Sequence, residues 1–209
     1  KYANACGALA VSRHGCTPAY PSWEELQFFF ERGIERPDLR NDAELEQVHW
    51  ATNRAGDWSS VKTFAFDHRM QLEEMPGYSK DKGGAFKELC LQAALDVQAG
   101  QQGYGILCDN RIGRAALHAA SGSGLWIGRP TEFPGSRPIQ LEPELGADLG
   151  QLREWALENV VKLLVFCHPE DDAATRAEQE EVVKRLWHAS RRNGLEFLLE
   201  IIPSKVGAV

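Results

Sequence analysis

The sequence predicts an α/β protein in which about five strand–helix units form part of a (β/α)8, or TIM, barrel. From residue 61 onwards, short apolar runs alternate with amphipathic helical segments, a pattern typical of parallel strands that are buried on both faces. Charged residues follow several of these runs, where barrels carry their chemistry. A doubly wound sheet fits the same alternation, but no GxGxxG follows a strand, which disfavours its dinucleotide-binding form.

The individual elements follow from the apolar periodicity. Strands are expected at residues 61–66, 104–108, 125–128, 160–166 and 197–202, and helices at residues 84–99, 112–120, 147–158 and 173–193. The buried face of helix 84–99 is expected to consist of Phe86, Leu89, Cys90, Ala93 and Val97. Gly194 follows the last helix as a C-terminal cap.

The first 33 residues predict a separate helix–turn–helix unit. Its first helix covers residues 2–10, a turn follows around Gly15 and Pro18, and a capping box of Ser22 and Glu25 starts a helix that ends at Gly33. Residues 34–47 are rich in charge and predict a linker or a short surface helix, and residues 48–209 contain the barrel segment. Because the chain starts without Met and has only five strands, we expect a fragment of a longer protein.

Composition excludes several classes of partner. The formal net charge of −7 disfavours binding to nucleic acid and to anionic membrane surfaces. No apolar run approaches the roughly 20 residues that cross a bilayer, and no signal peptide opens the chain. The five widely spaced cysteines predict reduced thiols in a cytoplasmic protein.

Lys162 and Glu200 are the strongest candidates for chemistry. Each is the single charged residue within an otherwise apolar strand. Consecutive parallel strands are usually neighbours, so the two side chains are expected to meet inside the barrel. A buried lysine beside a glutamate is suited to carbonyl chemistry and proton transfer, but a structural ion pair or a lysine that reaches solvent explains the pattern equally well.

Further candidates lie just after strands. Asp67 and Asp109 end the first two strands, and each is either a site residue or a helix cap. Arg69 and Arg129 are expected to bind a phosphate or another anionic group of the substrate. His68 and His168 lack recognised metal-ligand spacing, so we expect no metal site.

Residues 3–21 resemble the C-terminal helix and final turn of ribokinase-like sugar kinases, in the small-residue run that surrounds Cys6. This resemblance implies that residues 1–33 are a remnant of such a kinase. The catalytic part, with its ATP and Mg, would precede this chain.

Residues 48–209 resemble class I aldolases, in the stretches 64–69, 161–166 and 197–201. The resemblance implies catalytic roles for Asp67, Lys162 and Glu200, with the Schiff-base lysine on a sixth strand beyond Val209. The implied reaction is retro-aldol cleavage of 2-deoxy-5-keto-gluconate 6-phosphate, a small phosphorylated sugar acid of myo-inositol catabolism, without a cofactor. The alternative is a barrel that regulates the kinase without chemistry of its own. An open barrel exposes a strand edge, so self-association is also expected.

Overall fold

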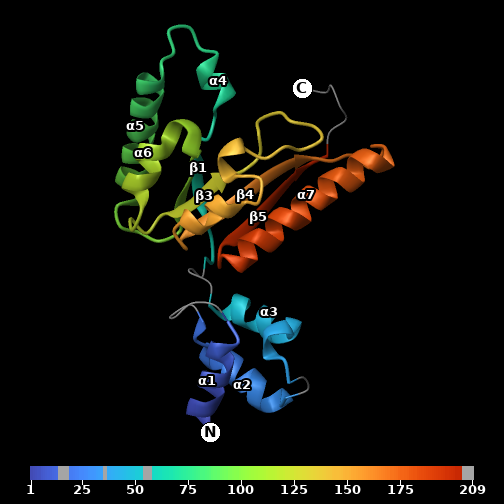
Figure 1. The fold of residues 1–209 in the computed structure, drawn as a ribbon. Coiled ribbons are helices and arrows are strands. Elements are labelled where there is room, and N and C mark those ends of the chain that lie inside the picture. The colour runs from blue at the N-terminus through green and yellow to red at the C-terminus, as the bar shows by residue number, and fades with distance from the viewer. Residues whose placement is uncertain (14–18, 35–36, 54–57, 204–209) are drawn as a thin grey trace. The chain divides into compact units, whose positions relative to one another are not determined.

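The structure, a computed structural model, describes residues 1–13, 19–34, 37–53 and 58–203. The chain forms two compact units, Lys1–Ala55 and Gly56–Val209 (Figure 1). The turn expected around Gly15 and Pro18, and the thiol of Cys16, lie outside the described residues. Across the described ranges, no helix combines the length and the apolar character that a membrane span requires.

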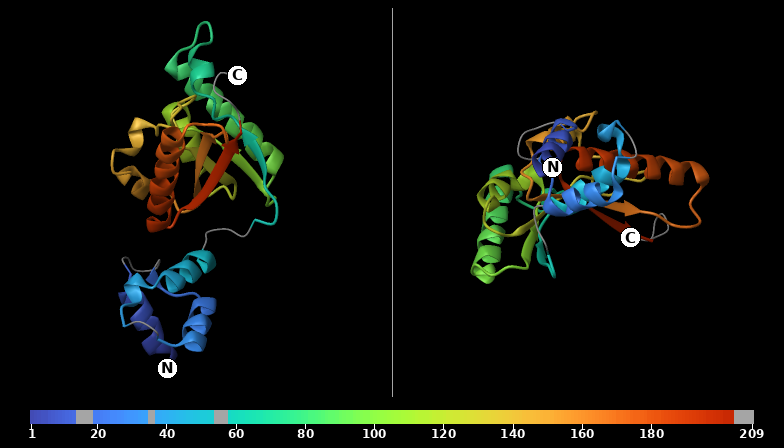
Figure 2. Two further views of the ribbon diagram at one scale, coloured as in Figure 1. Left: turned by 90° about the vertical axis from the view of Figure 1, so that its right-hand side faces the viewer. Right: turned by 90° about the horizontal axis from the view of Figure 1, so that it is seen from below.

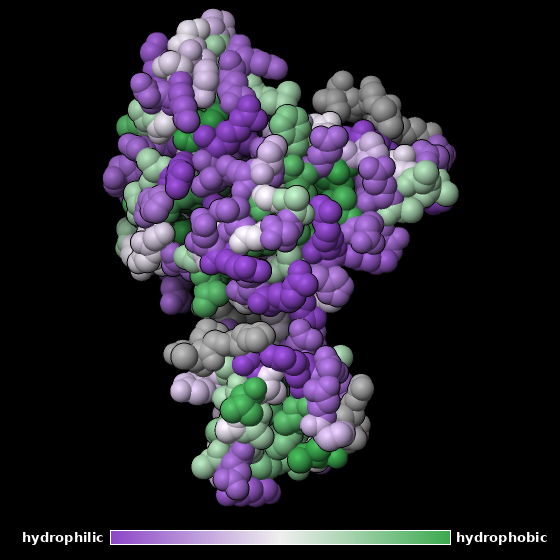
Figure 3. Space-filling view, viewed as in Figure 1, coloured by the Kyte–Doolittle hydropathy of each residue, from purple (hydrophilic) through white to green (hydrophobic). Residues whose placement is uncertain are grey.

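The first unit is a small bundle of three helices. The helices are α1 (Tyr2–Val11), α2 (Trp23–Arg32) and α3 (Ala43–Thr52), with a 3₁₀ helix at Leu39–Asn41 before α3. Their shared core contains Ala5, Leu9, Leu26, Phe29 and Leu45. Apolar side chains also remain on the surface of this unit (Figure 3).

The end of the first unit differs from the sequence-based expectation. Residues 34–47 were expected to form a linker or a short surface helix; residues 43–47 start the longer helix α3, and Leu45 is buried in the core, with only 1% exposed. The charged residues around Leu45 lie on the solvent side of a helix that has one strongly buried apolar residue. The division between the units therefore falls at Ala55 rather than between residues 33 and 48.

The caps of the first unit follow the sequence closely. The Ser22 hydroxyl accepts a hydrogen bond from the Glu25 amide at 3.1 Å, as the capping box predicts. Asp42 caps α3 in the same way, at 3.1 Å from the Leu45 amide, and also binds the guanidinium of Arg32. Asp42 is 5% exposed, so this carboxylate links α2 to the start of α3.

The second unit consists of five strands with helices between them. The strands are β1 (Lys62–Ala65), β2 (Tyr104–Leu107), β3 (Trp126–Pro130), β4 (Asn159–Phe166) and β5 (Glu196–Ile202). The helices are α4 (Met70–Glu73), α5 (Lys80–Gln98), α6 (Asn110–Ala120) and α7 (Ala173–Arg192), and two 3₁₀ helices (Pro143–Leu145 and Gly150–Glu154) lie between β3 and β4. The α-helix expected at residues 147–158 is replaced by the second 3₁₀ helix; the other expected elements are present.

All five strands are parallel and lie side by side in sequence order, β1-β2-β3-β4-β5. Ile127 of β3 packs with residues of α5 and α6, and Val161 of β4 packs with α7. The register pairs Ile127 with Asn159 and Arg129 with Val161, so these residues share one face. Helices α5, α6 and α7 therefore all cover the same face, here called the outer face; the opposite face is the inner face (Figure 2).

Helix α5 buries a different stripe from the one that its apolar residues predict. Phe86, Leu89 and Val97 are 47%, 70% and 64% exposed, and Ala93 is also exposed. The buried stripe consists of Gly83, Lys87, Cys90, Leu91, Ala94 and Gln98. A lysine and a glutamine are buried because both have hydrogen-bond acceptors in the neighbouring backbone.

Removing the Asp42 carboxylate is expected to destabilise the first unit. The Arg32 hydrogen bond holds the pKa of Asp42 below its ordinary value, so its contribution to stability is present above that ordinary value and is lost as the pH falls through the folded-state pKa. In Asp42→Ala, the free energy of unfolding at pH 7 should fall by about 2 kcal/mol or more. Amide hydrogen exchange in α2 and α3 measures this change.

Glu44→Gln is the matched control, because Glu44 binds the same guanidinium at 2.8 Å but its side chain is 70% exposed. It should change stability by less than about 1 kcal/mol. Equal losses in the two variants would show that burial of Asp42 has no special importance.

Candidate acid–base site on the inner face of the sheet

Lys162 lies in the middle of the sheet, on the inner face. It is the partner of Pro130 in the register of β3 and β4, and the flanking residues Val161 and Leu163 point into the outer core. Lys162 is only 3% exposed. An ammonium group in such a position requires compensating carboxylates.

Two carboxylates compensate Lys162. Its Nζ lies 3.1 Å from Oε2 of Glu200 and 3.6 Å from Oε1 of Glu132. Leu164 is the register partner of Glu200, so Lys162 and Glu200 lie diagonally across adjacent strands on one face. The expected Lys162–Glu200 pair is confirmed. The Glu200 side chain is 50% exposed, which leaves the pair accessible from one side.

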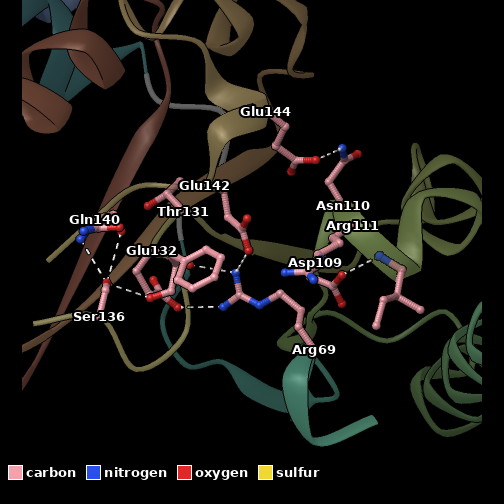
Figure 4. Close-up of polar contacts among 12 residues, drawn as sticks. Arg69, Asp109, Asn110, Arg111, Thr131, Glu132, Ser136, Gln140, Glu142 and Glu144 are labelled. Carbon is pink, nitrogen blue, oxygen red and sulfur yellow. Dashed lines mark hydrogen bonds and ion pairs between the residues drawn. The ribbon is translucent and has the colours of Figure 1, made fainter. Parts of the chain in front are cut away.

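Glu132 joins this pair to a second buried cation, Arg69. Figure 4 shows the contact between Glu132 and Arg69. Oε1 of Glu132 accepts from Nη2 of Arg69 at 3.0 Å, and Oε2 accepts from the Leu164 amide at 3.0 Å. Nη1 of Arg69 donates to the Glu132 carbonyl at 2.8 Å and to Oε1 of Glu142 at 2.9 Å. Arg69 is 4% exposed, so its guanidinium is held within the protein by these partners, and its expected phosphate contact stays a prediction.

Glu142 shares Arg69 with Glu132 and is itself 6% exposed. Burial raises the pKa of Glu142 above its ordinary value, against the opposing effect of Arg69. The antiparallel bridge between Glu132 and Leu141 brings both glutamates into reach of Arg69. The ion pairs of Arg69 with these two glutamates thus hold the β3–β4 connection against the segment that follows β1.

Asp109 forms the helix cap that the sequence analysis gave as one of its two alternatives, and its expected substrate contact stays a prediction. It is 1% exposed, its Oδ2 caps α6 through the Ile112 amide at 2.7 Å, and its Oδ1 binds Nζ of Lys87 at 2.7 Å. Close approach of α6 to β2 requires Gly113, because a Cβ there would lie 2.4 Å from Sγ of Cys108. Burial, together with the charge of Asp109, raises the pKa of the Cys108 thiol to about 12, so this thiol is inert.

Lys87 is one of the residues that sequence reasoning missed, together with Glu132 and Glu142. It is fully buried, and its Nζ also donates to the carbonyl oxygens of Phe66 and His68. These carbonyls flank Asp67, so Lys87 fixes the backbone on both sides of that residue. Its position in the stripe of Cys90, Leu91 and Ala94, at helical spacing, was the signal in the sequence.

Asp67 follows Ala65 on the side of β1 that faces inward, because Phe66 between them is buried in the outer core. In the described residues, its carboxylate makes no hydrogen bond or ion pair with Lys162 or Glu200. The structure thus brings together two of the three expected catalytic residues and supplies Glu132 as an unexpected third member. Within the described ranges, no cluster of three His, Cys, Asp or Glu side chains has the arrangement of a metal site.

Arg129 lies on the opposite side of the sheet. Its register partner is Val161, on the outer face, and its guanidinium stacks on Trp155 at 3.7 Å. Strand alternation separates it from Lys162. The expected substrate contact of Arg129 therefore does not belong to the Lys162–Glu200 site.

Loss of the Arg69 guanidinium should destabilise the second unit strongly. In Arg69→Met, two buried carboxylates lose their cation, and we expect the free energy of unfolding to fall by about 3–5 kcal/mol. Chemical denaturation, monitored by circular dichroism, measures this change in the free energy of unfolding. Arg111→Met is the control, because Arg111 forms a more exposed pair with Glu73; its effect should stay below about 1 kcal/mol.

The raised pKa of Glu142 predicts a defined pH dependence. The Glu142 carboxyl binds its proton more tightly in the folded chain than in the unfolded chain. The stability that this protonation gives the folded chain is fully present below the ordinary pKa of 4.5, and it is lost as the pH rises through the folded-state pKa. Glu142→Gln should flatten this part of a curve of stability against pH. An unchanged slope in the variant would assign the effect to another group.

Comparison with known proteins identifies the family of the chain. No curated protein sequence matches it. The profile of a family described as an uncharacterized protein conserved in bacteria (DUF2090) matches residues 25–209. The match begins within α2, includes α3 and covers the whole sheet. The chain therefore belongs to the DUF2090 family.

Proposed function

We propose that the second unit contributes the inner-face acid–base residues of a class I aldolase-like lyase. In this proposal, β1–β5 are the first five strands of a (β/α)8 barrel. Sequential parallel order with helices on one face supports it, because right-handed crossovers that always advance in one direction produce this arrangement. A doubly wound sheet reverses direction and places helices on both faces.

The single observation that carries the proposal is the Lys162–Glu200 pair. A buried ammonium at 3.1 Å from a carboxylate that is half exposed combines a fixed positive charge with a group that can exchange protons with solvent or substrate. Lys162 has two carboxylate neighbours, so it is suited to stabilise negative charge rather than to act as the nucleophile. The proposal assigns the nucleophile to a different lysine.

The resemblance to class I aldolases supplies the reaction. A lysine on the next strand would form an imine with the substrate ketone, with loss of water, and the iminium would accept the electron pair of the breaking carbon–carbon bond. Glu200 would transfer protons during imine formation, and Asp67 would take the proton from the hydroxyl on the departing carbon. The proposed substrate remains 2-deoxy-5-keto-gluconate 6-phosphate, cleaved to dihydroxyacetone phosphate and malonate semialdehyde.

A scaffold without chemistry is the second candidate, and one observation favours it. Glu132 connects Lys162 to the Arg69 cluster, so the inner-face charges form a continuous network of the kind that also holds structural cores together. Under this alternative, the unit would serve a linked kinase as a regulatory or structural module, and Lys162 and Glu200 would contribute to stability alone.

The variant Glu200→Gln, made in the natural protein that carries this unit, distinguishes the lyase from the scaffold without chemistry. If Glu200 transfers protons, the variant should cleave the phosphorylated sugar acid about 100-fold or more slowly, with its fold retained. The measurement is turnover, together with borohydride trapping and mass spectrometry, which should locate the adduct on a lysine other than Lys162.

Glu196→Gln is the control, because it makes the same chemical change on the same strand. Its cleavage rate should stay within about twofold of that of the unmodified protein, since only a group that transfers a proton in the reaction causes a much larger loss. A protein that never cleaves the substrate and forms no adduct would contradict the lyase proposal. Equal activity of Glu200→Gln and the unmodified protein would contradict the role of Glu200.

A further inference from the structure

A polar pocket of about 270 Å³ lies on the outer face, between α6 and the β3–β4 connection. Its lining includes the side chains of Arg114, His118, Arg129, Glu144, Glu154 and Trp155. The Lys162–Glu200 pair lies on the other face of the sheet, so this pocket is separate from the proposed acid–base site. Its volume is close to the lower limit of small-molecule sites in proteins.

Arg129 is held in a fixed orientation in this pocket. Its guanidinium stacks on Trp155 at 3.7 Å, Nη1 donates to Oδ1 of Asn159 at 3.0 Å, and Nη2 donates to Oδ1 of Asn110 at 3.3 Å. Two amides and an indole ring orient the charge without neutralising it. A preorganised guanidinium of this kind is well suited to bind a carboxylate or a phosphate.

The positive charge of the pocket is only partly compensated. Burial, opposed by the charge of Glu144 and aided slightly by that of Arg114, lowers the pKa of Arg129 to about 10. The carboxylate of Glu144 is near but accepts a hydrogen bond from Asn110 at 2.9 Å instead (Figure 4). In the described part of the chain, no carboxylate lies within ion-pair distance of Arg129 or Arg114.

Arg114 and His118 lie on the α6 side of the pocket, where Arg114 adds a second positive charge. They lie one turn apart on α6 and therefore point in the same direction. Both side chains are exposed, and neither makes a hydrogen bond within the described residues. Glu144 and Glu154 line the same pocket and offer acceptors to hydroxyl or ammonium groups.

We propose that this pocket binds a small polar metabolite through one phosphate or carboxylate group, held by Arg129 and Arg114, with its hydroxyl or ammonium groups directed to Glu144 and Glu154. An anion between the two arginines offsets positive charge that the protein compensates only in part. The two glutamates make an inorganic anion alone a weaker ligand than a molecule that also carries donor groups. The inference does not depend on the lyase proposal.

Titration of residues 1–209 with glycerol 3-phosphate, glycerate and inorganic phosphate, followed by NMR of the Trp155 indole N–H, tests this site. At least one of the two organic anions should shift this signal at saturable concentrations and bind more tightly than inorganic phosphate. The stronger of the two identifies the preferred anionic group. Arg114→Gln should weaken binding about tenfold, because one charged contact is lost.

Arg111→Gln is the matched control, with the same loss of charge on the same helix, outside the pocket and paired with Glu73. Its affinity should remain within about twofold of the unmodified chain, since its charge contributes only at long range. Absence of any saturable shift with all three probes would overturn the proposal. An equal loss in Arg111→Gln and Arg114→Gln, or tightest binding by inorganic phosphate, would also overturn it.

Discussion

The carboxylate of Glu132 connects three parts of the second unit that lie far apart in sequence. One oxygen binds Arg69, which follows β1, and the other accepts the amide of Leu164 in β4. The same residue is close to Lys162. Because Glu132 is 6% exposed, each of these contacts forms away from solvent, where loss of a partner costs far more than on the surface. The inner-face charges, the β3–β4 connection and the segment after β1 therefore depend on one another.

The charges around Glu132 do not balance completely. Arg69 and Lys162 supply two cations, and Glu132, Glu142 and Glu200 supply three carboxylates. The protein accommodates the difference in two ways: Glu200 remains half exposed, and burial raises the pKa of Glu142. Glu200 is consequently the member of the cluster that solvent or a substrate can reach. A carboxylate that is accessible at one side and fixed by a buried lysine at the other is suited to proton exchange.

The sequence predicted the strands well, because continuous apolar runs in a parallel sheet are a strong signal. It also predicted the Lys162–Glu200 pair, since a single charged side chain in a buried apolar strand is costly unless it contacts an opposite charge. It failed where burial did not follow hydrophobicity. Helix α5 buries Lys87 and exposes Leu89, because three acceptors near the end of β1 and at Asp109 satisfy the ammonium. Those acceptors come together only in the folded chain, so helical spacing can align Lys87 with the buried residues of α5 but cannot show that its charge is satisfied there.

Strand alternation explains why the expected anion-binding residues do not form one site with Lys162. In the register of β3 and β4, Pro130 pairs with Lys162 and Arg129 pairs with Val161, so adjacent positions send their side chains to opposite faces. Arg69 faces the inner network but is occupied by Glu132 and Glu142. In the structure, the guanidinium of Arg69 is thus engaged by carboxylates of the inner network, and that of Arg129 belongs to the outer pocket, where Trp155 and two asparagines orient it.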